Sequence, residues 1–561
     1  MRFPNNRLLR YLSVFAVVIL AGDLAAVLSV SEGVSRCANA SKATTAIEDF
    51  PKPLSPDLPY DVDVEALAKL DRDNQIPEAQ RLFDTFAWQA FIALNWPAAA
   101  DGEPDKTKSM KDYTANRVWM GWRRNDTVFL PNGEKPKPWN SRLALAEKDH
   151  ILWRFSKMLN ERRSPENALT DFVQAFTGPL VDQNGVFVRY QSYINKPQFD
   201  YIVEHELYNQ EGQVEYVAKK GNKVQFPPNQ KQPEKRHGSM GIKLAWKQLG
   251  PKDIPERFFT IEAIVVSTSY DKDGKPVKTQ SKQTMGLVGM HLTALTRSSP
   301  NWIWTTFEHV DNVVANELQF GQSLKDKKVR VRPSFNNPDA PTKLVNQLPP
   351  PNAPPGDSKN YTTWDESKTT NPTQLTRIIP IPPATQELNR QVGALLREQG
   401  SVFQYYQLVG AQWPVQPGFP AFGGGAGSAP ESIVFKAPGR VVPVYLINTV
   451  MESYFQNGIQ ASGPLEEDDR LPVGFFADNP TERVTPDRTK VFGTESCVGC
   501  HFSAGAAVGF KRDENGKLVR EDKTGLKIPI YGKNGNYGQT GSAGYFWQLQ
   551  LKARQKQTPP K

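Results

Sequence analysis

Two cysteines and a histidine near the C-terminal end of the chain have a spacing that supports a specific chemistry. Cys497 and Cys500 are separated by two residues, and His501 follows directly. In such a C-x-x-C-H pattern the thiols can add to the vinyl groups of a haem, and the adjacent histidine can supply the proximal nitrogen to the iron. The motif therefore predicts one covalent haem c, with Cys497 and Cys500 as attachment points and His501 as the proximal iron ligand.

Two other kinds of site also use cysteines at this spacing. A thioredoxin-like redox pair would need a βαβ context, whereas the flanks here are rich in Gly, Asp and Lys. A structural zinc site would need two more ligands, and the available candidates are His291 and His309, because the third of the 3 cysteines is the distant Cys37. Haem attachment is the favoured interpretation, with these two as alternatives.

At the motif the sequence resembles the c-type cytochromes, and over most of its length it is similar to a group of large exported bacterial proteins with one haem-attachment motif near the C-terminus. The wider resemblance rests on these stretches and the motif: FAWQAFIALNWP (86–97), NKPQFDYIV (195–203), GLVGMHL (286–292), WIWTTFEHVDNV (302–313) and YQLVGAQWP (406–414). It implies haem binding and electron transfer without naming a substrate, and its site residues carry over only to Cys497, Cys500 and His501.

The sixth iron position is less defined than the proximal one. Small cytochromes c usually have a methionine ligand downstream of the motif, but residues 502–561 contain neither Met nor His. Met451 is the nearest upstream Met or His, on one face of a predicted helix with Ile447 and Tyr454. Met451 is therefore the candidate sixth ligand. The alternatives are that it only packs in the core or that the sixth position is open.

Three further side chains are of types that could contact the haem. Met290 and His291 lie in a strand pattern, so both are expected to pack in a sheet. His309 stands beside Glu308 and follows a Trp-rich strand, which favours a hydrogen-bonded structural histidine over a haem ligand.

The N-terminal segment, residues 1–40, has the features of an export signal. It combines a basic start, a short apolar run and an A-x-A site at residues 38–40. The basic residues of its start are Arg2, Arg7 and Arg10. We expect cleavage before Ser41 and a protein in the periplasm or on the outer face of the cytoplasmic membrane. The alternative is a retained membrane anchor.

Composition limits the other function classes. The 561 residues are 39% apolar, which is enough for a sizeable core and excludes wholesale disorder. With 3 cysteines the chain is no disulfide scaffold. The net charge of +9 is mild for so long a chain, so it favours an acidic redox partner protein or a membrane surface over nucleic acid.

The pattern of apolar and polar residues after the N-terminal segment predicts an α+β fold in several parts. After a polar leader (41–75) we expect an α+β module with an antiparallel sheet (76–330), a Pro-rich linker (331–383) and a mostly helical haem module (384–561). Predicted helices cover 78–94, 385–399, 444–456 and 545–553. Predicted strands cover 240–246, 258–267, 284–295, 302–307 and 403–409, and a hairpin turn is expected at Asn184 and Gly185.

The favoured function is an exported monohaem c-type cytochrome that passes single electrons. Because a carrier needs only one small domain, the large module at 76–330 also leaves two alternatives. One is a haem enzyme, such as a peroxidase or small-molecule oxidoreductase, with an open sixth position. The other is a haem-bearing sensor or interaction protein.

Overall fold

The structure is a computed structural model of the full chain, and it describes a defined set of residues. These are 49–72, 76–112, 115–140, 150–152, 179–219, 224–313, 331–337, 339–341, 344–347, 365, 367–368, 371–377, 381–413, 446–454, 497, 501, 504–522, 524–532 and 542–557. The expected export signal (1–40) and Cys500 lie outside them. By its internal contacts the chain divides into Met1–Pro51 and Lys52–Lys561, and every helix and strand named here belongs to the second unit.

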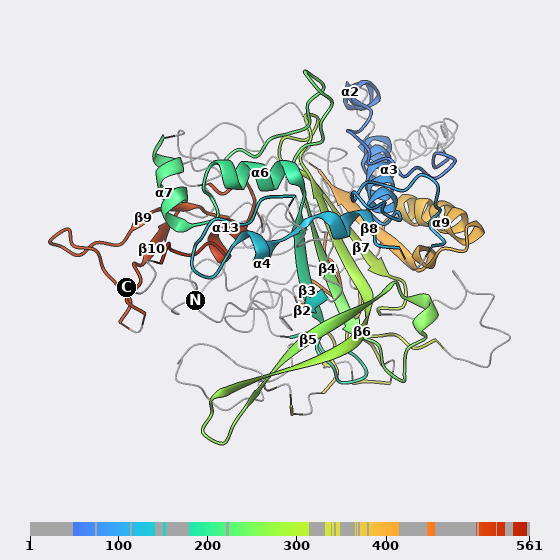
Figure 1. The fold of residues 1–561 in the computed structure, drawn as a ribbon. Helices are drawn as coiled ribbons and strands as arrows, with labels where there is room; N and C mark the ends of the chain where they lie inside the picture. The colour runs from blue at the N-terminus through green and yellow to red at the C-terminus, as the bar shows by residue number, and fades with distance from the viewer. Residues whose placement is uncertain are drawn as a thin grey trace, which may run out of the picture. The chain divides into compact units, whose positions relative to one another are not determined.

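An 8-stranded, almost entirely antiparallel sheet organises this unit (Figure 1). Its strands are β1 (Arg123–Arg124), β2 (His150–Leu152), β3 (Arg189–Ile194), β4 (Met240–Gln248), β5 (Thr260–Tyr270), β6 (Pro276–Ala294), β7 (Ile303–His309) and β8 (Tyr406–Gln412). They run in the order β1-β3-β4-β6-β5-β2, with β7 pairing β6 and β8 pairing β7. The long β6 pairs with β5 through its first part and with β4 and β7 through its second, while β2 joins β5 in parallel.

Helices and shorter pieces accompany the sheet. The α-helices are α2 (Val64–Arg72), α3 (Ile76–Leu94), α4 (Asn125–Val128), α6 (Lys196–Glu204), α7 (Gln210–Lys219), α9 (Pro383–Glu398) and α13 (Gln548–Leu551). The 3-10 turns are η1 (Val118–Gly121), η2 (Pro255–Arg257) and η5 (Val402–Tyr405). A separate two-stranded ribbon pairs β9 (Ala507–Phe510) with β10 (Pro529–Tyr531). Among the helices, α3 and α9 pack against β8, and α7 packs against the separate strand β9. In the described part of the chain, no helix combines the length and apolarity needed to cross a membrane.

The apolar face of α3 packs where the sequence periodicity places it. Phe83 and Phe91 are fully buried. The ring of Phe91 stacks on Phe307 of β7 with centroids 4.3 Å apart. On the next helix face, Trp88 donates a hydrogen bond from Nε1 to Asn389 of α9 at 2.9 Å. Aromatic burial of this size contributes several kcal/mol and fixes α3 and α9 against the sheet.

Most of the expected elements are confirmed. The predicted helices at 78–94 and 385–399 correspond to α3 and α9, and the predicted sheet strands to β4, β5, β6 and β7. The strand expected at 403–409 begins three residues late, after η5, as β8. The hairpin turn forms at Gly185, whose φ of 83° suits glycine. The helix expected at 545–553 is shorter, as α13.

The helix predicted for 444–456 is wrong for its described residues, because 446–454 form turns and a short 3-10 piece. Side-chain hydrogen bonds to distant backbone explain the difference. Asn448 donates from Nδ2 to the carbonyl of Phe307 at 2.9 Å, and its Oδ1 accepts from the backbone of Val450 at 3.0 Å. Tyr454 donates from its hydroxyl to the carbonyl of Pro179 at 2.5 Å. Such bonds offer the backbone an alternative to the helix.

The α+β class with an antiparallel sheet is therefore confirmed, whereas a mostly helical C-terminal module is not shown. The described residues beyond 504 form the β9–β10 ribbon and α13. The sheet also contains strands from both sides of the expected linker at 331–383. β8, which follows the linker, pairs with β7 of the expected first module.

Candidate functional site

One wall of a cavity is a face of the sheet. Lys243 of β4 lies directly opposite His291 of β6, and Thr293, two residues along β6, lies opposite Trp304 of β7. Partners on neighbouring strands point to the same side, and so do residues two apart along one strand. All four side chains line the cavity. The strand register thus brings together side chains that are far apart in the sequence.

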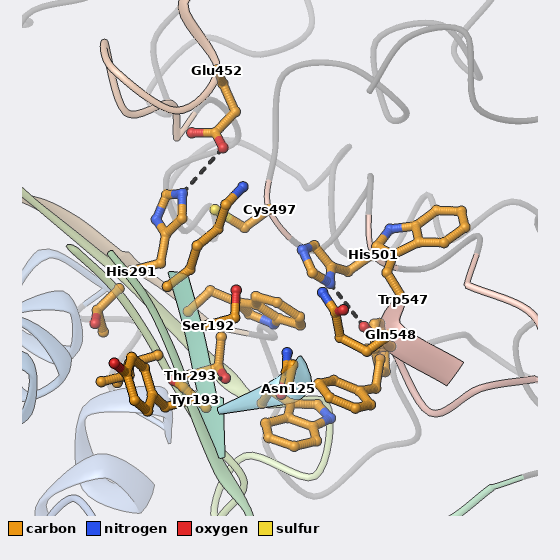
Figure 2. Close-up of a pocket in the computed structure, with 18 of the residues that line it drawn as sticks. Asn125, Ser192, Tyr193, His291, Thr293, Glu452, Cys497, His501, Trp547 and Gln548 are labelled. Carbon is orange, nitrogen blue, oxygen red and sulfur yellow. Dashed lines mark hydrogen bonds and ion pairs between the residues drawn. The ribbon is translucent and has the colours of Figure 1, made fainter. Parts of the chain in front are cut away.

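The opposite wall comes from the C-terminal part of the chain (Figure 2). Cys497 and His501 both line it, as do Trp547 and Gln548. The backbone is helical at both Cys497 and His501. The cavity holds about 150 Å³, and about 1000 Å³ with its open mouth. The enclosed volume is below the range of about 300–1,000 Å³ that is typical of pockets for small organic ligands.

The imidazole of His501 is held by its Nδ1 atom. Nδ1 lies 2.8 Å from the carbonyl oxygen of Tyr545, which can only accept, so Nδ1 carries the proton. Nε2 is then left with a free lone pair, the form in which a histidine binds a metal. The ring of Trp304 lies 4.5 Å away between centroids. Burial lowers the pKa of His501 to about 4, so the imidazole is neutral near pH 7.

Cys497 lies beside the same space. Its half-buried side chain packs between two apolar clusters, and Sγ lies 3.6 Å from the carbonyl oxygen of Leu446. Cys500, the second predicted attachment point, lies outside the described residues. The structure therefore brings together two of the three motif side chains, Cys497 and His501, at one cavity.

The cavity lining combines aromatic rings with polar side chains, which are the kinds of group that contact a haem in proteins. The lining contains aromatic rings from Trp302, Trp304 and Trp547, which suit the faces of a porphyrin. Among the described residues, the buried amide oxygens of Asn125 and Gln548 have no hydrogen-bond partner although both residues line the cavity. A bound ligand with polar groups would satisfy them, and a rotated amide would present its NH₂ to a carboxylate such as a haem propionate.

Met451, the candidate sixth ligand, is placed elsewhere. Its side chain is fully buried in an apolar cluster with Val288, Phe335 and Leu375. It is not among the residues that line the cavity, although its neighbours Ile447 and Glu452 are. The expected helix would have put Met451 and Ile447 on one face, but the turns at 446–454 separate them. The structure thus gives Met451 a packing role and no support as a ligand.

His309 is a structural histidine, as its polar neighbourhood indicated. Its Nε2 atom donates to the carbonyl of Arg257 at 2.9 Å, and Nδ1 accepts from the backbone of Asp311 at 3.1 Å. Both nitrogens are therefore engaged at the end of β7. Within the described residues, no group of three or more His, Cys, Asp or Glu side chains is arranged to hold a metal ion.

His291 is expected from its strand pattern to pack in the sheet, and the structure places it at the cavity instead. Its Nε2 atom lies 3.1 Å from Oε1 of Glu452, a residue that no sequence motif marks. The alternation along β6, in which Met290 is fully buried and His291 is not, was the available signal. No sequence signal pointed to Glu452 as its partner, because Glu452 lies 161 residues away from His291 in the chain.

Comparison with known proteins finds no relative of this chain. No family model matches it, and neither does any curated protein or any solved structure.

Proposed function

We propose that this protein is an exported monohaem c-type cytochrome that passes single electrons. One haem would be attached through Cys497 and Cys500, with His501 as the proximal iron ligand. The observation that carries the proposal is that Cys497 and His501 line one aromatic cavity while His501 keeps Nε2 unprotonated. Haem supplies the electron transfer itself, and the protein tunes it through ligation, burial and hydrogen bonds.

The residues around the cavity have separable tasks in this proposal. Tyr545 fixes the tautomer of His501 through its carbonyl, which also makes the imidazole a stronger donor to a metal. Trp304 packs against the same imidazole and limits its rotation. Asn125 and Gln548 offer amide groups to the polar edge of the cofactor. A helical segment at the motif, part of the expected helical haem module, is supported by the backbone at Cys497 and His501.

The proposed location and partner follow from the sequence. Export, cleavage before Ser41 and a periplasmic protein match the compartment in which thioethers to haem form. Without residues 1–40, which carry four basic and two acidic side chains, the net charge is +7, and it favours an acidic protein as the redox partner.

The test is whether haem stays with the denatured polypeptide. We expect the wild-type chain to keep its haem after acid–organic extraction, with a mass increased by one haem. Cys497→Ser and Cys500→Ser should each leave one thioether or none, because each removes one sulfur. Cys37→Ser is the matched control and should keep both thioethers, because Cys37 precedes the mature chain. Complete extraction of haem from the wild type would reject the proposal.

A further inference from the structure

A line of aromatic side chains runs from the cavity to helices α6 and α7. Trp304 lies against the imidazole of His501 with ring centroids 4.5 Å apart, and Trp302 follows at 6.3 Å from Trp304. Both tryptophans line the cavity. Phe226 lies 6.0 Å from Trp302, and Tyr201 of α6 lies 5.2 Å from Phe226. Aromatic rings at these spacings pack against each other, so the line is continuous from the cavity to α6.

The line ends in a hydrogen-bonded pair of tyrosines on α6 and α7 (Figure 1). The hydroxyl oxygens of Tyr201 and of Tyr216 on α7 are 2.6 Å apart. The oxygen of Tyr201 also accepts from the backbone N–H of Gln225 at 3.1 Å, which leaves its own hydrogen for the bond to Tyr216. Both tyrosine side chains are half-buried, whereas the two tryptophans are each 4% exposed. The line therefore leads from the interior to the surface.

The residue types in this line determine what it can conduct. Indole and phenol rings give up one electron more readily than a benzene ring, so the tryptophans and tyrosines of the line can be oxidised in turn, whereas Phe226 cannot. An electron crosses between neighbouring rings by tunnelling, which weakens steeply with distance. Because the ring of Phe226 packs against both Trp302 and Tyr201, it can bridge the two without being oxidised itself.

We propose that this line carries an oxidising equivalent from the cavity to the tyrosine pair Tyr201 and Tyr216. The inference rests on the proposed function, which puts a redox cofactor in the cavity, and the oxidant is a strong one-electron oxidant formed there from a peroxide. Trp304 gives one electron to the oxidant, Trp302 replaces that electron, and Tyr201 replaces the one lost by Trp302 through the ring of Phe226. The O–H bond of Tyr201 breaks, its proton moves to the oxygen of Tyr216, and Tyr216 releases its own proton to water. The oxidant is thereby reduced by one electron, and the tyrosine pair loses one electron and one proton.

The experiment starts the oxidation at the cavity without iron. A ruthenium(II) polypyridyl complex on a flexible linker is attached to Cys497, which lines the cavity, in the full chain prepared without haem. Cys37→Ser and Cys500→Ser leave Cys497 as the single thiol of the chain. A light flash with an external electron acceptor converts the complex to ruthenium(III), and transient absorption follows the radicals. We expect a tryptophanyl radical first and a tyrosyl radical in its place later.

Variants identify the residues that carry the oxidising equivalent. Trp302→Phe keeps an aromatic ring but resists oxidation, so the tryptophanyl radical should persist and the tyrosyl radical should be lost. The double variant Tyr201→Phe and Tyr216→Phe should also lose the tyrosyl radical. Tyr60→Phe is the matched control and should keep it, since the ring of Tyr60 lies beside His237 and not in the line.

A second measurement uses the protein as isolated. Azidyl radicals oxidise tryptophan side chains in solution, and a spin trap followed by peptide mass mapping locates the tyrosyl radical that results. The adduct should lie on Tyr201 or Tyr216 and should be lost from both in Trp302→Phe.

A tyrosyl radical of unchanged yield in the double variant or in Trp302→Phe would overturn the inference. So would one that disappears in Tyr545→Phe, because the ring of Tyr545 lies 5.9 Å from Trp304 and the oxidising equivalent would then stay at the cavity. Neither measurement uses iron, so these failures are distinct from a failure of the haem proposal.

Discussion

Asp84 of α3 accepts a hydrogen bond from Thr385 of α9, with 2.6 Å between Oδ2 and Oγ1. Its other oxygen accepts from the backbone N–H of Ala411 on β8 at 3.1 Å. One carboxylate therefore joins two helices and a strand at a point where it is 2% exposed. Burial raises its pKa to about 6 in spite of these hydrogen bonds.

The raised pKa of Asp84 predicts a pH-dependent stability. The folded protein holds the proton up to about pH 6, whereas the unfolded chain releases it near 3.8, so this group costs stability as pH rises between the two values. Asp84→Asn stays neutral, and its amide can donate to Thr385. Relative to the variant, the wild type should lose about 2 kcal/mol of unfolding free energy from pH 4 to pH 7. Urea unfolding of both proteins across this range measures it, and parallel pH profiles would contradict it.

Met451 provides a test of core packing against iron ligation. Because its side chain fills a buried apolar cluster, Met451→Ala should cost about 2–5 kcal/mol of unfolding free energy. The haem absorption spectrum should not change. Met451→Leu, which nearly conserves the volume, should cost less than about 1.5 kcal/mol and serves as the control. A high-spin spectrum in either variant would restore Met451 as the sixth ligand.

Arg257 and Asp311 form a buried bidentate ion pair near the end of β7. Nε lies 2.5 Å from Oδ2 and the terminal nitrogen 2.8 Å from Oδ1, with side chains 2% and 3% exposed. Arg257→Met should cost about 3–5 kcal/mol, because it leaves Asp311 charged and buried. The double variant with Asp311→Leu should be less destabilised than the single one. Chemical denaturation measures both, and additive losses would show that the pair is not coupled.

The N-terminal segment makes a prediction about the mature protein. N-terminal sequencing of the native protein should begin at Ser41, because the A-x-A site ends at Ala40. The protein should then fractionate with the periplasm. A chain that begins at Met1 in the membrane fraction would support the retained anchor instead.

Elements whose residues carry a strong period were predictable from the sequence. The apolar spacing of α3 is a local signal that tertiary structure did not override. So is Gly400, which follows the end of α9 with a φ of 67°. The segment 446–454 has the same kind of apolar spacing but is not a helix. There, Asn448 and Tyr454 bond to backbone groups of distant residues, which no local pattern can reveal.

The candidate site also contains residues that the sequence reveals and residues that it does not. The motif residues Cys497 and His501 could be found from their spacing, because thioether chemistry fixes that spacing. The facing wall could not, because it depends on the register that sets Lys243 opposite His291 and on a turn that brings Glu452 to the same place. Register is a property of paired strands, so a single sequence indicates it only weakly.

The pairing of β7 with β8 also determines when the exposed edge of β7 is covered during synthesis of the chain. All residues of β7 are buried, yet its outer edge is covered only when Tyr406–Gln412 arrives, well after Ile303–His309 has been made. Until then the strand presents unpaired N–H and C=O groups beside apolar side chains, a template for pairing with another chain. A truncation that ends before Tyr406 would leave this edge of β7 without its partner strand, so nascent and shortened chains expose the same stretch of sequence.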